Sequence, residues 1–349
     1  MNRYFENKSL RMTSLDTLKG FACIAVVILH CPFPTIIGNY INAFCRFAVP
    51  LFFMISGYFC HFKKGSDGLR LLIKKIKHIL FLITVSLFIY LIWGFVNYGP
   101  SIFNNIVFEN NGALNFLLFN KIPTQIFRNA GHLWFLVALI YCYPAGYIVN
   151  YCIKNKKLKY ILALFILTVR YIIGIASCNG LLPLEECHYQ NFWLVGFPFF
   201  ILGQMFAEPR FKSHLDKLSK ANLIILMIIG CGMTCLEYMI FGGACDLFLG
   251  TVLMLFSMFA YSVKNPFSLC NKSLKSFCYI GEKLSLIVYI IHPIFVYLIS
   301  IFDNLFYQQN WFVKMLYLGL KPIAVIFISI LTAYLFEIFK EHCLKRRLK

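Results

Sequence analysis

Long apolar segments recur along nearly the whole chain, and they limit its possible folds more than any other feature. Each has about the length that an α-helix needs to cross roughly 30 Å of hydrocarbon. Hydrophobic residues make up 60% of the 349 residues and charged residues only 13%, a composition outside the usual range of soluble domains. We therefore predict an all-α, polytopic transmembrane helix bundle of about ten spans, near residues 15–37, 43–60, 79–97, 132–151, 160–176, 191–207, 221–240, 244–262, 284–302 and 319–339.

The connections between these spans contain no segment with the composition of a soluble domain. Residues 1–349 are therefore predicted to form a single transmembrane domain. Its ends are a short N-terminus, residues 1–14, and a basic tail, residues 340–349.

Basic residues are concentrated on one side of the predicted bundle. The net charge is +19, and 27 of the 33 Lys and Arg residues fall in the N-terminal segment, in alternate connections or after the last span. The positive-inside rule assigns that side to the cytoplasm, so both termini are predicted to be cytoplasmic. Topology accounts for the basic excess, and we predict membrane lipid rather than nucleic acid as the partner of the basic tail. No oligomeric state is predicted.

The first apolar segment, "SLDTLKGFACIAVVILH", carries ionisable residues at both ends. At about 100° and 1.5 Å per residue, Asp16, Lys19 and His30 fall on one helix face, with Lys19 and His30 roughly 16 Å apart. Ionisable groups in a membrane usually face a bundle interior or a watery cavity, and they mark candidate functional sites. The alternative is that Asp16 and Lys19 anchor the helix at one surface and His30 lies among the outer headgroups.

Further polar residues fall at the predicted outer level. Arg46 and Arg170 lie in the outer halves of the second and fifth spans, where a cation needs a partner or water. His132 begins the fourth span, and Glu186 precedes the sixth. A polar vestibule open to the outside would explain all four, whereas snorkelling to the headgroups would explain the arginines alone.

A basic cluster begins the third span on the predicted inner side. Lys74, Lys75 and His78 crowd this helix start, and Lys75 and His78 share a face because they are three residues apart. The cluster could bind an anionic headgroup or the phosphates of coenzyme A. It could equally be a topology signal.

The 14 cysteines include no Cys-x-x-Cys pair, and no metal site is predicted. Cys178 and Cys187 fall in one short outer connection and could pair.

Five segments in a fixed order resemble the acyltransferase 3 family of integral membrane acyltransferases over about residues 11–340. They are "LDTLKGFACIAVVILH", "RFAVPLFFMISGYF", "KKIKHIL", "GHLWFLVALI" and "SLIVYIIHPIFVY". One family signature is Arg, ten residues, then His, and Lys19 and His30 occupy those places. The other is Arg-x-x-Arg, which Lys75 and His78 match best.

The resemblance implies transfer of acetyl from cytoplasmic acetyl-CoA to a hydroxyl of a cell-envelope glycan or lipid-linked sugar, in the bacterial cytoplasmic membrane. Imidazole suits the removal of a hydroxyl proton, so His30 is the candidate base, with Lys19 and Asp16 orienting it. Lys74, Lys75 and His78 are candidates for acetyl-CoA binding. Candidates for substrate binding are Arg46, His132, Arg170, Glu186 and His292.

His292 precedes Pro293, which we expect to kink the ninth span and to release a backbone carbonyl. A structural role for His132 and His292, satisfying buried partners, is the alternative.

A second resemblance leads to a different function. "NFWLVGFPFFILG", "LFFMISGYF" and the Lys-rich start of the third span are similar to the membrane domain of vancomycin-resistance serine racemases. That domain is implied to move an amino acid across the membrane. The alternative hypothesis is therefore a transporter of a small polar solute such as serine, with Lys19, His30 and Arg46 lining its pathway.

Overall fold

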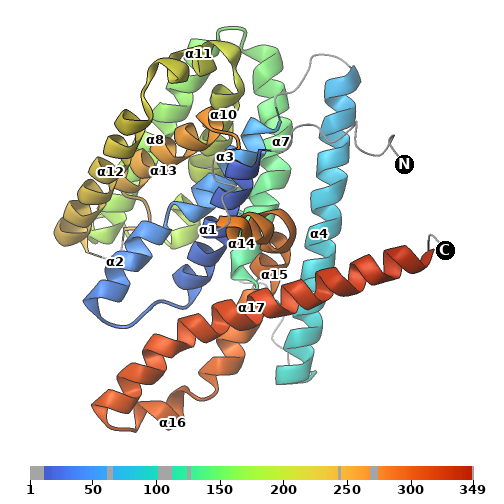
Figure 1. Ribbon diagram of the computed structural model, residues 1–349, viewed down its shortest axis with the longest axis vertical. Coiled ribbons are helices and arrows are strands. Elements are labelled where there is room, and N and C mark those ends of the chain that lie inside the picture. The colour runs from blue at the N-terminus through green and yellow to red at the C-terminus, as the bar shows by residue number, and fades with distance from the viewer. Residues whose placement is uncertain are drawn as a thin grey trace. The chain divides into compact units, whose positions relative to one another are not determined.

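The computed structural model describes residues 12–60, 66–100, 112–123, 127–242, 245–267 and 274–347 (Figure 1). Within these residues the chain is helical and contains no strand. The prediction of an all-α fold is confirmed. In the described part of the chain, eight helices or helix pairs are long and apolar enough to cross a membrane: Thr13–His30, Thr35–Tyr58, Asp67–Tyr98, Gly131–Cys152, Lys156–Cys178, Lys220–Phe241, Lys275–Ser300 and Trp311–Cys343.

The two remaining predicted spans are also helical. The segment predicted at 191–207 lies in Glu186–Ala207, which is bent by 75° against Pro209–Lys217. The segment predicted at 244–262 corresponds to a shorter apolar helix, Leu249–Lys264. The first two spans differ from their predicted limits, because the first helix ends at His30 and the next begins at Thr35 after Pro34. Proline has no N–H and cannot continue the preceding helix.

The chain divides into two compact units, which are described separately. The first unit comprises residues 1–48, 212–234 and 250–349, and the second comprises 49–211 and 235–249.

Helix α1 (Thr13–His30) is central to the first unit. It contacts α14 (Lys275–Tyr279), η4 (Ile280–Leu284), α15 (Ser285–Ser300), α17 (Trp311–Arg347) and α2 (Thr35–Cys45). Its apolar face is buried with that of α15 and α17 in one cluster of small and branched side chains: Cys23, Val27, Cys31, Leu284, Val288, Val325 and Ala333. At the start of α1, the Ser14 hydroxyl donates to the Ser262 carbonyl of α13 (Leu249–Lys264) at 2.8 Å. Helix α1 is therefore tied to its neighbours at its first turn and along its length.

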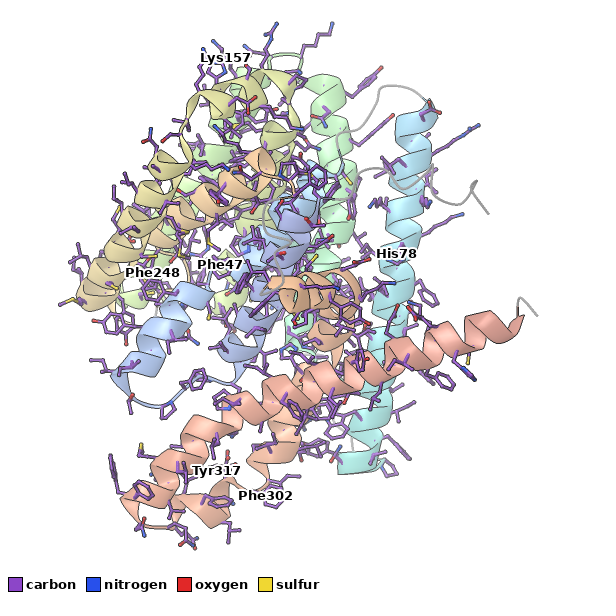
Figure 2. All side chains as sticks on the ribbon, viewed as in Figure 1. Phe47, His78, Lys157, Phe248, Phe302 and Tyr317 are labelled. Carbon is purple, nitrogen blue, oxygen red and sulfur yellow. The ribbon has the colours of Figure 1, made fainter. Side chains whose placement is uncertain are left out.

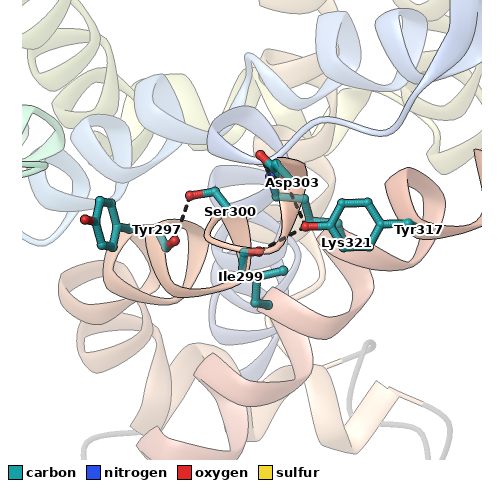
Figure 3. A network of polar contacts seen from close by, with 6 residues as sticks. All are labelled: Tyr297, Ile299, Ser300, Asp303, Tyr317 and Lys321. Atoms are coloured by element: carbon teal, nitrogen blue, oxygen red, sulfur yellow. Dashed lines mark hydrogen bonds and ion pairs between the residues drawn. The ribbon is translucent and has the colours of Figure 1, made fainter. Parts of the chain in front are cut away.

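A polar network joins α15 to α17 around the short helix α16 (Asp303–Tyr307) (Figure 3). The Lys321 ammonium donates to both carboxylate oxygens of Asp303 at 2.8 Å. The Tyr317 hydroxyl lies 2.6 Å from Asp303 Oδ1 and 2.9 Å from the Ile299 carbonyl oxygen. Lys321 and Asp303 are mostly enclosed, so this network fixes the end of α15 against α17.

The second unit packs α7 (Trp134–Cys152) against α4 (Ser66–Tyr98) and α10 (Phe197–Ala207), and α10 against α8 (Lys156–Cys178). The π-helical turn η2 (Phe192–Gly196) leads into α10. Helix α3 (Ala48–Tyr58) approaches α10 so closely that a Cβ on Gly57 would overlap the Phe200 carbonyl oxygen. Small residues allow helix backbones to approach in this way. The remaining elements of the described chain are the long helix α12 (Lys220–Phe241) and the shorter α6 (Gly112–Phe119), η1 (Gly131–Leu133), α9 (Glu186–Tyr189) and α11 (Pro209–Lys217).

Large apolar side chains are exposed along several long helices. Phe81 and Phe88 of α4 are 65% and 61% exposed, and Phe165 of α8 and Phe327 of α17 are 62% and 64% exposed. Water would penalise such surfaces, whereas lipid tails would cover them. The exposed apolar faces of these helices are therefore suited to contact with lipid tails.

Candidate functional site

The candidate catalytic residues Asp16 and Lys19 form an ion pair in α1. Lys19 Nζ lies 3.0 Å from Asp16 Oδ1, and the Asp16 side chain is only 5% exposed. Because α1 is unbroken from Thr13 to His30, the predicted separation of roughly 16 Å between the Lys19 and His30 positions follows from helix geometry. The pair and the histidine thus lie at opposite ends of one helix.

At the other end of α1, the structure brings His30 against His292 of α15. Their ring centroids are 5.1 Å apart and the ring planes are inclined at 46°. His30 is exposed, whereas His292 is fully buried. This ring contact joins two residues that are far apart in the sequence, and the sequence analysis did not predict it. The only sequence signal was that both histidines occur in segments resembling one family.

Arg46 follows the last residue of α2 in the same unit and is half-buried. Because α2 and α3 together form the span Thr35–Tyr58, Arg46 lies midway along this span and not near its edge.

The candidate acetyl-CoA-binding residues lie on α4 in the second unit. His78 is exposed, as Figure 2 shows on this helix, Lys74 is exposed and Lys75 is half-buried. Burial raises the pKa of the Cys60 thiol to about 11, and the positive charge of Lys75 acts in the opposite direction. Lys75 is the least exposed of the three side chains, while Lys74 and His78 face outward. The two lysines and the histidine line one stretch of helix and could contact several phosphates.

Arg170 of α8 is the most deeply buried cation among the described residues, at 1% exposure. Its guanidinium carbon lies 4.7 Å from the centre of the Tyr189 ring. Within the described part of the chain, neither Nε nor Nη1 of Arg170 has a hydrogen-bond acceptor. Asp246 acts on Arg170 electrostatically. Arg170 is thus a desolvated cation with two nitrogen donors that make no hydrogen bond within the described chain, which is uncommon in protein interiors.

Glu186 and His132 belong to the same unit. Glu186 is exposed at the start of α9 and, like Arg170, acts electrostatically on Tyr189. Tyr189 thus interacts electrostatically with both Glu186 and Arg170, which the sequence predicted only to lie at the same outer level of the membrane. His132 is buried and its ring stands edge-on to the buried Tyr90 of α4, with 5.5 Å between centroids. Sequence reasoning identified neither tyrosine, because both resemble ordinary aromatic positions of a membrane helix.

The described residues contain no group of three or more His, Cys, Asp or Glu side chains that could hold a metal ion. Cys178 and Cys187 are free thiols, so the pairing considered for them is absent.

Eight apolar spans with exposed aromatic and aliphatic faces define a multi-pass membrane protein. The chain belongs to the acyltransferase 3 family, because the model of this family, an acyltransferase domain, matches residues 12–339. This match confirms the resemblance seen in the sequence, and the protein is an acyltransferase. The resemblance to the serine racemase membrane domain stays a prediction. No curated protein and no solved structure matches the chain.

Proposed function

We propose that the protein is an O-acetyltransferase that moves acetyl from cytoplasmic acetyl-CoA to a hydroxyl of a cell-envelope glycan or lipid-linked sugar. The observation that carries the proposal is an exposed histidine, His30, in the family's histidine position and backed by a second, buried histidine. The proposal places the protein in the bacterial cytoplasmic membrane, as one domain with both termini in the cytoplasm. Membrane lipid is its other proposed partner.

In the proposed reaction, His30 removes the proton from the acceptor hydroxyl as the oxygen attacks the thioester carbonyl. A carbon–oxygen bond forms and the carbon–sulfur bond breaks. The proton then passes to the thiolate, which leaves as coenzyme A. The products are the O-acetyl ester and free coenzyme A, so atoms and charge balance.

The ion pair of Lys19 and Asp16 supports this step from the other end of α1. Lys19 supplies a positive charge on the same helix face as His30, and the buried carboxylate of Asp16 fixes the direction of its ammonium. Their proposed role is to orient the reacting groups rather than to touch the transferred proton.

Donor binding is proposed at Lys74, Lys75 and His78. The phosphates of coenzyme A carry several negative charges, and clustered ammonium groups bind phosphate by charge-assisted hydrogen bonds. The acceptor is proposed to meet Arg46, His132, Arg170 and Glu186 directly and His292 through its contact with His30, and the buried Arg170 offers unused donors.

The decisive experiment uses purified protein in lipid nanodiscs with acetyl-labelled acetyl-CoA and an envelope extract as acceptor source. We expect label to leave coenzyme A in the wild type and in His342→Ala, a control at an exposed histidine on α17. His30→Ala should reduce this turnover at least about 100-fold, the usual scale for losing a general base. Equal turnover in His30→Ala and wild type would contradict the mechanism, and serine uptake without any turnover would contradict the function.

A further inference from the structure

The position of the proton on His292 follows from the hydrogen bonds of its ring. His292 Nδ1 lies 2.9 Å from the Tyr289 carbonyl oxygen and 3.1 Å from the Val288 carbonyl oxygen. Carbonyl oxygens accept hydrogen bonds and cannot donate them. Nδ1 must therefore carry a proton, and in the neutral ring Nε2 carries the lone pair.

Pro293 explains why a carbonyl is available for this bond. In a regular α-helix the residue 293 N–H would donate to the carbonyl of residue 289. Proline has no N–H, so the Tyr289 carbonyl loses its helical donor inside α15. The neighbouring side chain, His292, supplies the missing donor at the shorter of its two distances.

The ring that is fixed in this way packs against His30. His292 is fully buried, which limits its exchange with water, and the ring centroids are 5.1 Å apart. His30, the candidate base, is thus the ring neighbour of a buried histidine whose proton is held on Nδ1.

We propose that His292 is a positioning residue that sets the tautomer of His30. In the reacting complex, its Nε2 accepts the N–H of one His30 ring nitrogen, so the other His30 nitrogen presents its lone pair to the acceptor hydroxyl. When His30 takes the hydroxyl proton, the His292 acceptor stabilises the resulting imidazolium. His292 keeps its own proton on Nδ1 throughout and does not touch the substrate. This role rests on the proposed acetyl transfer and adds a chain of contacts from the Tyr289 carbonyl to the base.

Two substitutions separate this role from a purely structural one. The amide nitrogen of asparagine can replace Nδ1 as a donor to the carbonyl, whereas glutamine reaches the position of Nε2 and can offer an acceptor oxygen there. His292→Gln should therefore retain more turnover than His292→Asn. We expect kcat to fall about 10-fold in His292→Gln and about 100-fold in His292→Asn, with KM for acetyl-CoA unchanged, as for other outer residues that orient a reacting group. The opposite order would show that His292 only satisfies the Tyr289 carbonyl and would overturn the proposal.

Pro293→Ala tests the origin of the tautomer. The restored N–H at residue 293 competes with His292 for the Tyr289 carbonyl. We expect kcat to fall about 10-fold, the scale of losing an orienting contact, while the unfolding temperature stays equal or rises. Unchanged kcat in a folded Pro293→Ala protein would count against the proposal.

The tautomer can also be measured without turnover. Solid-state NMR of ¹⁵N-histidine-labelled protein in liposomes distinguishes a protonated Nδ1 from a protonated Nε2, and the spectrum of His292→Gln identifies the His292 signals. We expect a protonated Nδ1, and a proton on Nε2 instead would overturn the proposal. Because this readout needs no acetyl-CoA, a protonated Nδ1 in a protein that fails to turn over acetyl-CoA would support the proton placement and contradict only the proposed function.

Discussion

Gly281 of η4 lies against the backbone of α1 so closely that a Cβ built on it would overlap the Asp16 carbonyl oxygen. The contact involves two backbones, neither of which can move away without displacing its helix. We expect Gly281→Ala to destabilise the protein by about 3 kcal/mol, the upper range for overpacking a close contact. Thermal unfolding in detergent micelles measures the change.

Gly232 on α12 provides the matched control, because nothing lies within 4 Å of a Cβ placed there. An alanine in an open helical position gains about 0.5–1 kcal/mol over glycine. Gly232→Ala should therefore unfold at the same temperature as the wild type or higher. Similar losses in both variants would contradict the close packing of α1 on η4.

The second prediction concerns Lys321 and Asp303, whose side chains are 13% and 21% exposed. Lys321→Met removes two charge-assisted hydrogen bonds and leaves the carboxylate with the Tyr317 hydroxyl. We expect a loss of about 2 kcal/mol, as for hydrogen bonds to charged groups. The double variant Lys321→Met/Asp303→Asn should recover part of the loss, because it no longer encloses an uncompensated charge. A double variant less stable than Lys321→Met would disprove the pairing.

Hydropathy and length were sufficient to predict the helices, because the membrane thickness fixes the length of an apolar span. Each predicted span overlaps a helix, and Asp16 and Lys19 pair because helix geometry relates residues three apart. The contact of His30 with His292 could not be predicted from helix periodicity, since that fixes neighbours within a helix and leaves the packing of α1 on α15 open. The same holds for Arg170 and Tyr189, which lie on different elements.

The third prediction tests the ion pair in α1. Asp16→Asn preserves the shape of the side chain but removes the charge that directs Lys19. If this pair orients the reacting groups, acetyl transfer should fall about 10-fold, the usual scale of losing an orienting contact. Lys19→Met should give a similar loss, and the double variant should lose little more, because coupled residues are not additive. Fully additive losses in kcat would show that the two side chains act independently.

The fourth prediction concerns the pH dependence of the contact between Lys121 and Glu185, two residues outside the spans. The hydrogen bond from Lys121, at 2.9 Å, and its charge lower the pKa of the exposed Glu185 carboxyl. A lowered folded pKa stabilises the folded state above the ordinary carboxyl pKa, and this contribution disappears as pH falls through the lowered value. Protection of the amides near α9 from hydrogen exchange, measured relative to the intrinsic exchange rate at each pH, should therefore fall as the pH is lowered through this acidic range. Lys121→Met should show fast exchange already at neutral pH, and equal exchange in both proteins would refute the contact.

The Arg170 side chain is only 1% exposed, and within the described chain its Nε and Nη1 atoms donate no hydrogen bond. Replacing a buried charge by an apolar side chain of similar length is often neutral or stabilising. If Arg170 binds the acceptor, Arg170→Met should unfold at the same temperature or higher, yet need about 10-fold more envelope extract for half-maximal transfer, roughly the worth of one charged hydrogen bond. Release of label from acetyl-CoA to water should be unchanged, because the donor is not involved. Arg210→Met, at an exposed position on α11, controls for the loss of charge. A fall in the unfolding temperature with no change in acceptor requirement would instead make Arg170 a structural partner of Asp246, whose charge acts on it.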